Sequence, residues 1–163
     1  MSLPLDLFDI KINTSFQTEG RVTANGTDIV TVARTQIGVP YSWGGGGFMG
    51  KSIGIKEGDS DGSHTVGFDC SGLTQYAVYK GTGKVIKRNS YDQYEDKECR
   101  HVPYANHQPG DLVFFNDSPS HKIHHVAIIS GPDMMIHAPH TGDHVREGQI
   151  YTKGRVEFVQ RCV

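Results

Sequence analysis

The stretch Phe68-Asp69-Cys70-Ser71-Gly72-Leu73-Thr74-Gln75-Tyr76 has the pattern of a helix start. Asp69 is a favourable N-cap, and Leu73 and Tyr76 follow at helical spacing. Gly81 is expected to end the helix. Cys70 then occupies the first helical position, where the helix dipole and unpaired backbone amides stabilise a thiolate. The stretch therefore predicts a reactive cysteine, although a small buried core cysteine fits the same residues.

The length and composition of the chain are typical of one domain with a hydrophobic core. The chain has 163 residues and a formal net charge of -2, so we expect neither nucleic acid nor an anionic membrane as a partner. No apolar run is long enough to span a bilayer, and no secretory signal is recognisable. We expect a monomer.

The chain has three cysteines, Cys70, Cys99 and Cys162. An odd count means that at least one is free or pairs between chains. If Cys70 is the reactive cysteine, the other two can form a disulfide in an oxidising compartment. The sequence leaves this pair open because it does not show whether the two lie close together.

Upstream of the cysteine stretch, we expect a packing helix capped by Thr27 or Asp28 and ended by Gly38. The following run, 41–47, contains four glycines, which permit close backbone approach. It is either a flexible surface loop or a substrate wall in which Tyr41 and Trp43 are the aromatic members. The run lacks the lysine of a phosphate-binding loop, so nucleotide binding is excluded.

Three further segments complete the expected architecture. Residues 48–67 are polar and glycine-rich, which predicts a long loop that could act as a lid beside the site. A capping-box pattern predicts a short helix that begins at Ser90. Residues 110–115 predict a turn that leads into a buried strand.

Residues 125–130 and 133–138 both have strand composition, with Gly131-Pro132 between them, which predicts a β-hairpin. With a turn centred on Gly131, His125 and His137 lie directly opposite each other on one face of the sheet. A slip of one residue would separate them onto different faces. His121 and His124 are expected to be loop or surface residues.

Two adjacent histidines suit either a catalytic relay or a metal site. A cysteine nucleophile needs a base, and the base needs a partner that fixes its orientation; Cys70, His125 and His137 fill these roles in that order. Six histidines between 121 and 144 leave a zinc site open. The chain nevertheless lacks CxxC and HExxH spacing. Histidines on a polar sheet face remain the third possibility.

Four motifs, taken together and in order, resemble the NlpC-type cell-wall peptidases, a papain-like family of bacterial peptidoglycan hydrolases. The resemblance covers roughly residues 28 to 160. The motifs are Pro40-Tyr41-Ser42-Trp43-Gly44-Gly45, Phe68-Asp69-Cys70-Ser71-Gly72-Leu73, Pro109-Gly110-Asp111-Leu112-Val113-Phe114-Phe115, and His125-Val126-Ala127-Ile128 followed by Met135-Ile136-His137-Ala138-Pro139.

The resemblance implies an α+β, papain-like fold, in which the cysteine-bearing helix packs against a central antiparallel sheet of about five to six strands. Residues 1–26 would be a lead-in and 27–163 the peptidase domain. It also implies Cys70 as nucleophile, His125 as base and His137 as the third member. Residues Tyr41, Trp43, Asp69 and Ser71 would line the substrate site, and in some members residues at such positions hold the free amine of a terminal L-alanine.

The implied function is a secreted or extracellular cysteine endopeptidase that cleaves peptidoglycan stem peptides after γ-D-glutamate, through an acyl-enzyme and without a metal or organic cofactor. An amidase or an acyltransferase that uses the same three residues is the alternative enzyme. A non-catalytic wall-binding module and a zinc protein are the remaining alternatives. The long segment 48–67 departs from the simplest members of the family at that edge of the site.

Overall fold

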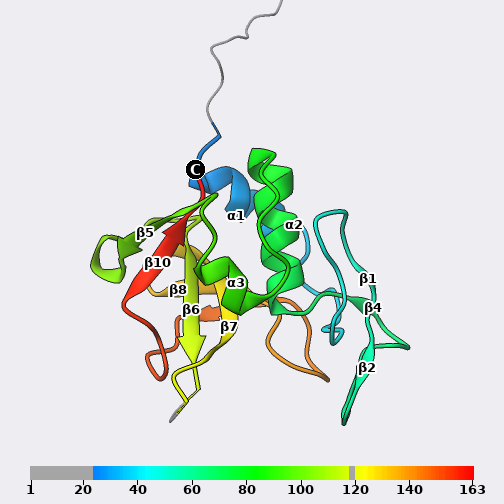
Figure 1. Cartoon of the computed structure of the whole chain (residues 1–163). Helices are drawn as coiled ribbons and strands as arrows, with labels where there is room; N and C mark the ends of the chain where they lie inside the picture. The colour runs from blue at the N-terminus through cyan, green and yellow to red at the C-terminus, as the bar shows by residue number, and fades with distance from the viewer. Residues whose placement is uncertain (1–23, 118–119) are drawn as a thin grey trace, which may run out of the picture.

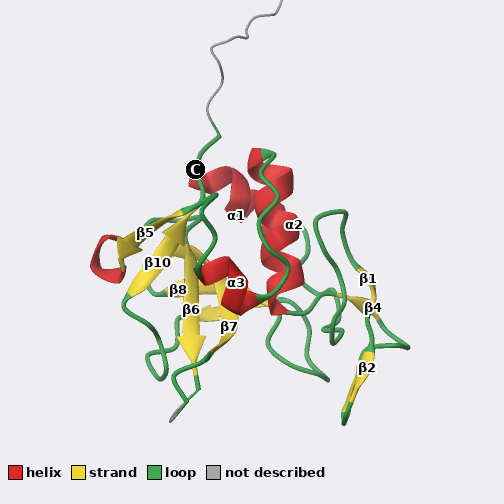
Figure 2. Ribbon diagram, viewed as in Figure 1, coloured by secondary structure: helices red, strands yellow, loops and turns green. Residues whose placement is uncertain are grey.

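The computed structural model of the protein describes residues 24–117 and 120–163, and these form an α+β fold. Six antiparallel strands make one sheet in the order β5-β10-β6-β7-β8-β9, and helices lie beside it (Figure 1; Figure 2). The predicted fold class and strand number are therefore confirmed. The helices are α1 (Gly26–Arg34), α2 (Cys70–Thr82), α3 (Ser90–Tyr94) and the short 3-10 turn η1 (Tyr104–Asn106). The sheet strands are β5 (Arg100–Pro103), β6 (Leu112–Asn116), β7 (Ile123–Gly131), β8 (Met134–His137), β9 (Arg146–Gln149) and β10 (Phe158–Arg161).

The sheet buries apolar side chains on both faces, which positions its central strands firmly. Leu112 and Phe114 of β6 belong to the core shared with α1 and α2. Their neighbours Val113 and Phe115 belong to a second core on the opposite face. This alternation is what a strand with period two requires, and it confirms the predicted buried strand after Gly110.

Helix α2 begins at Cys70, as predicted, and the Asp69 side chain accepts a hydrogen bond from the backbone N–H of Gly72 at 2.7 Å. The predicted end at Gly81 is wrong. The helix continues to Thr82 and ends at Gly83, whose φ of 84° is the left-handed conformation that glycine adopts readily. Gly81 instead lets α1 approach, because a Cβ there would lie 3.0 Å from the backbone nitrogen of Ile29.

The caps of the other two helices differ from the prediction by one to three residues. Helix α1 is capped by Asn25, which forms a capping box with Asp28, and it ends at Arg34 well before Gly38. Helix α3 begins at Ser90, as expected, but its cap is Asn89. In each case an asparagine one position upstream of the helix supplies the oxygen that the first turn needs. Of the expected lead-in, residues 1–23 lie outside the described residues.

Segment 48–67 is more ordered than the predicted loop. It contains two small antiparallel ribbons on the side of α2 away from the main sheet (Figure 1). Strand β1 (Ser52–Ile53) pairs with β4 (Val66–Gly67), and β2 (Lys56–Glu57) pairs with β3 (Ser60–Asp61). We call residues 52–67 the ribbon segment.

Strands β7 and β8 form the predicted hairpin, but the predicted direct pairing of His125 with His137 is wrong. Ile128 pairs with Ile136 and Ile129 with Met135, and the register shifts between Ile129 and Gly131. The pairing is therefore offset by two residues from the expected one. Because side chains alternate between faces, an offset of two keeps both histidines on the same face.

A disulfide joins Cys99, just before β5, to Cys162 at the end of β10, which resolves the question that the sequence left open. Cys70 is the free cysteine of the chain. Within the described residues, no helix has both the length and the apolar character needed to cross a bilayer.

Candidate active site

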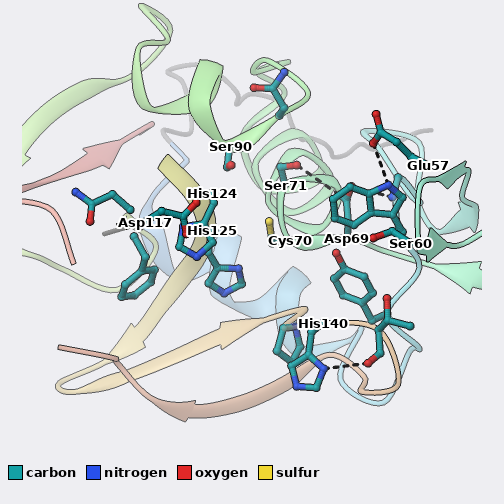
Figure 3. A pocket seen from close by; sticks show the side chains of 18 of the residues that line it. Glu57, Ser60, Asp69, Cys70, Ser71, Ser90, Asp117, His124, His125 and His140 are labelled. Atoms are coloured by element: carbon teal, nitrogen blue, oxygen red, sulfur yellow. Dashed lines mark hydrogen bonds and ion pairs between the residues drawn. The ribbon is translucent and has the colours of Figure 1, made fainter. Parts of the chain in front are cut away.

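Cys70 lies at the N-terminal end of α2 and lines a cavity of about 1110 Å³. His125, near the start of β7, lines the same cavity, and its ring and the sulfur of Cys70 lie near the centre of the close view (Figure 3). The helix and the sheet thus bring together two residues that are far apart in sequence. A thiol and an imidazole at one cavity are the minimum for nucleophilic catalysis by cysteine.

The two histidines of the hairpin are hydrogen-bonded through their rings. His125 Nε2 lies 2.8 Å from His137 Nδ1, and His137 is only 1% exposed. The bond occupies Nε2 of His125, so Nδ1 is the ring nitrogen left to exchange a proton with Cys70. Phe115 and Tyr151 pack against these rings, which further restricts the orientation of the imidazoles.

The hydrogen-bond pattern also constrains the tautomers. When Nδ1 of His125 carries a lone pair, its Nε2–H donates to Nδ1 of His137, and the hydrogen of His137 is then on Nε2. Among the described residues, His137 Nε2 has no hydrogen-bond partner although it is buried. The hydrogen bond between His125 Nε2 and His137 Nδ1 is therefore the only one that His137 makes through its ring among the described residues, and it orients the ring of His125.

Burial sets the charge state of the pair. It raises the pKa of Cys70 to about 12, with the Asp69 carboxylate adding to the rise and the backbone amides of Val126 and Ser71 opposing it. Burial also lowers the pKa of His125 to about 3, and the neighbouring His137 adds to that decrease. In the resting structure the effect of burial thus outweighs the helix-start stabilisation of a thiolate, so the pair is a neutral thiol and a neutral imidazole.

Asp69 and Ser71 flank the cysteine and share one partner that the sequence analysis missed. Nη1 of Arg88 lies 3.0 Å from Asp69 Oδ1 and donates to Ser71 Oγ at 2.9 Å, and its Nη2 donates to the carbonyl of Gly45 at 3.0 Å. The other oxygen of Asp69 accepts from the backbone N–H of Gly44 at 3.1 Å. Arg88 therefore ties the glycine run to the start of α2. Nothing in its local sequence marks this role, because its partners come from distant segments.

The glycine run forms one wall of the cavity. Tyr41 and Trp43 both line it. The backbone N–H of Ser42 donates to the carbonyl of Phe68, so the run lies beside the start of α2. Nε1 of Trp43 donates to Glu57 Oε1 at 3.2 Å, so the ribbon segment supports this aromatic side chain. Burial, reinforced by Cys70, raises the pKa of Tyr41, which keeps the phenol protonated.

Other polar residues line the cavity without having been singled out. His124 is about half exposed, as a surface residue should be, yet its Nδ1 lies 3.0 Å from Asp117 Oδ1 at the cavity rim. Lys153 lines the same cavity. Over residues 24–117 and 120–163, no three His, Cys, Asp or Glu side chains are grouped so that they could hold a metal ion.

A model of the NlpC/P60 family matches residues 38–161. The chain belongs to the NlpC/P60 family. Peptidoglycan endopeptidase RipB of Mycobacterium tuberculosis is 39% identical over 135 residues, which cover 83% of this chain and 52% of RipB. Gamma-D-glutamyl-L-lysine dipeptidyl-peptidase of Bacillus subtilis is 34% identical over 141 residues, which cover 83% of this chain and 40% of that protein. The chain thus spans about half or less of the length of these NlpC/P60 relatives.

Solved NlpC/P60 structures have the same fold. RipB from M. tuberculosis matches with a TM-score of 0.72 at 39% identity, covering 85% of this chain and 64% of that one. RipD from M. tuberculosis, described as a non-catalytic NlpC/p60 domain protein, matches with a TM-score of 0.71 at 32% identity, covering 85% and 97%. These likenesses confirm the predicted family and fold. Since one neighbour is described as non-catalytic, the shared fold alone does not determine catalysis.

Structures of RipA have been solved with substitutions at a cysteine, a histidine and a glutamate. The glutamate follows the histidine by the same number of residues as His137 follows His125. By this spacing, the NlpC/P60 chain described here has a neutral, buried histidine at a place where RipA has an acidic side chain.

Proposed function

We propose that the chain is a peptidoglycan hydrolase, a cysteine D,L-endopeptidase that cleaves stem peptides after γ-D-glutamate. One observation carries the proposal: Cys70 lines the same cavity as His125, and Nε2 of His125 is bonded to His137 Nδ1 at 2.8 Å. This arrangement supports Cys70 as nucleophile, His125 as base and His137 as the partner that orients the base. The names of the relatives, peptidoglycan endopeptidase and gamma-D-glutamyl-L-lysine dipeptidyl-peptidase, supply the substrate class.

The resting protonation state dictates how the reaction begins. The thiol proton of Cys70 moves to Nδ1 of His125 as the sulfur attacks the carbonyl carbon, because a neutral pair has no thiolate formed in advance. His125 becomes an imidazolium, and its Nε2–H donates to His137 throughout. The developing oxyanion accepts a hydrogen bond from the backbone amide of Cys70 and from the protonated hydroxyl of Tyr41.

The collapse of the intermediate breaks the carbon–nitrogen bond. The leaving amine takes the proton from Nδ1 of His125, and a thioester to Cys70 remains. A water molecule then gives a proton to Nδ1 of His125 and attacks the thioester carbonyl. When this second intermediate collapses, the carbon–sulfur bond breaks, the γ-D-glutamyl acid is released, and the sulfur takes the proton back from His125 to restore the thiol. No step needs a metal or an organic cofactor.

The lining of the cavity also supports a position for the substrate. We assign the acyl portion of the stem peptide to the wall formed by Tyr41, Trp43, Asp69 and Ser71. We also propose residues 27–163 as the peptidase domain, acting as a secreted monomer. The disulfide between Cys99 and Cys162 supports an oxidising compartment, since such bonds persist chiefly outside the cytosol.

Mass spectrometry of a synthetic stem peptide tests the proposal. We incubate L-Ala-γ-D-Glu-diamino acid-D-Ala with wild type and with Cys70→Ala. We expect wild type alone to produce the two fragments that arise from a cut after γ-D-glutamate. Cleavage that persists in Cys70→Ala would overturn the mechanism. If the free peptide is not cut, intact peptidoglycan is the second substrate, and release of the whole stem peptide from muramic acid would instead favour the amidase alternative.

A further inference from the structure

The cavity has a second charged region, on the far side of the catalytic pair from the substrate wall. Asp117 and His124 lie on one side of Cys70 and His125, whereas Asp69 and Glu57 lie on the other (Figure 3). We call the group Asp117, His124 and Lys153 the β6–β7 rim.

The three rim residues are brought together by backbone pairing. Asn116, the last residue of β6, pairs with Ile123 of β7, which places Asp117 and His124 at the same end of the sheet. The backbone N–H of Asn116 donates to the carbonyl of Gly154 at 2.8 Å, so Lys153 comes from a segment bonded to this strand end. A carboxylate, an imidazole and an ammonium group therefore line one part of the cavity.

The proposed function determines which part of the substrate this rim contacts. His125 gives its proton to the leaving amine, which is the α-amino group of the diamino acid. The diamino acid must then lie next to His125, on the side opposite the wall that holds the acyl portion. The rim is on that side, and His124 directly precedes the base in sequence.

We infer that the β6–β7 rim binds the end of the diamino-acid side chain and selects one that carries both an ammonium and a carboxylate group. This inference rests on the proposed endopeptidase function. Asp117 pairs with the ammonium group, and Lys153 pairs with the carboxylate group. His124, whose Nδ1 lies 3.0 Å from Asp117 Oδ1, positions that carboxylate.

The two diamino acids of peptidoglycan differ in the group that Lys153 would contact. A lysine side chain ends in an ammonium group alone, whereas meso-diaminopimelate ends in an ammonium and a carboxylate. With lysine in the rim, Asp117 still pairs with the substrate ammonium, but Lys153 has no substrate carboxylate to pair with. The rim therefore favours meso-diaminopimelate.

Two stem tetrapeptides, one with meso-diaminopimelate and one with L-lysine, test this selection by kcat/KM. Wild type should prefer the first by about tenfold, the size of one charge-assisted hydrogen bond. Lys153→Gln should remove that preference by raising KM for the diaminopimelate peptide, with the lysine peptide changed by less than about twofold. Asp117→Asn should lower kcat/KM for both peptides because both carry the ammonium group. Lys97→Gln, at an exposed position that does not line the cavity, is the control and should match wild type.

If Lys153→Gln lowers kcat/KM equally for both peptides, or lowers it for neither, the inference is overturned. If wild type cleaves neither peptide, the proposed function fails, and binding then decides the inference separately. Calorimetry with Cys70→Ala and the dipeptides meso-diaminopimelyl-D-Ala and L-Lys-D-Ala should show the same roughly tenfold preference. Equal affinities would count against the rim as a selective site.

Discussion

At the scale of single residues, Cys70 is subject to two opposing effects. The helix start and the amides of Val126 and Ser71 favour a thiolate, whereas burial and the Asp69 carboxylate favour the thiol. Burial is the larger effect, and it also keeps His125 neutral. The ring partner of His125 Nε2 is the imidazole of His137 and not a carboxylate, so this hydrogen bond brings no negative charge to an imidazolium.

The pH dependence of alkylation reports this balance. With a pKa of about 12 for Cys70, the thiolate fraction between pH 5 and 8 is small and rises about tenfold per pH unit. We therefore expect the iodoacetamide reaction at Cys70 to accelerate steadily up to pH 10, as followed by mass spectrometry. His137→Glu should raise the pKa of His125 and move the onset of fast alkylation to lower pH. A wild-type plateau between pH 5 and 8 would mean that an ion pair exists in the resting protein.

The sequence was sufficient to predict that Cys70, His125 and His137 lie together, but not what surrounds them. Cys70 was marked by a local helix-start pattern, and His125 and His137 by alternation along two strands, which depends only on parity. Arg88 was missed because its ion pair with Asp69 joins segments that only the folded chain brings together. His124 was correctly expected on the surface, but sequence could not show that this surface borders the cavity.

At the scale of secondary-structure elements, errors arose where the chain departs from regular periodicity. The hairpin and its shared histidine face were predicted, but the register was not, because the pairing shifts between Ile129 and Gly131. The ribbon segment was expected to be a loop, since strands of two residues are too short to show alternation. Such elements are held by contacts with the rest of the fold, in this case with the aromatic wall.

Gly62 tests whether the ribbon segment supports that wall. A Cβ at Gly62 would lie 2.3 Å from the carbonyl oxygen of Trp43, so Gly62→Ala must push the ribbon away from the wall. If the chain cleaves the stem peptide as proposed, we expect KM to rise severalfold with little change in kcat, since the added Cβ meets atoms of Trp43 and Ser42 and not of Cys70 or His125. Gly58→Asn is the matched control, because no atom lies within 4 Å of the added Cβ and asparagine tolerates the φ of 59°. An unchanged KM in Gly62→Ala would show that the wall does not depend on the ribbon.

At the scale of the whole molecule, the same fold occurs with and without catalysis, so individual side chains determine the activity. RipD is described as non-catalytic and still matches this chain with a TM-score of 0.71. The four ordered motifs were enough to predict the family and the sheet, because they include residues that pack as well as residues that line the cavity. They could not predict the disulfide, which depends on where the ends of β5 and β10 meet.

That disulfide lies away from the cavity, which separates stability from activity. Cys99 and Cys162 are 63 positions apart, so closing this loop restricts the unfolded chain considerably. We expect Cys99→Ala with Cys162→Ala to lower the free energy of unfolding by about 2–4 kcal/mol in urea titrations. The kcat/KM of the folded variant should stay within about twofold of wild type, since neither residue lines the cavity. Wild type in a reducing agent controls for the small core volume lost at Cys162 and should lose nearly as much stability. Equal stability of reduced and oxidised wild type would show that the cross-link does not stabilise the sheet.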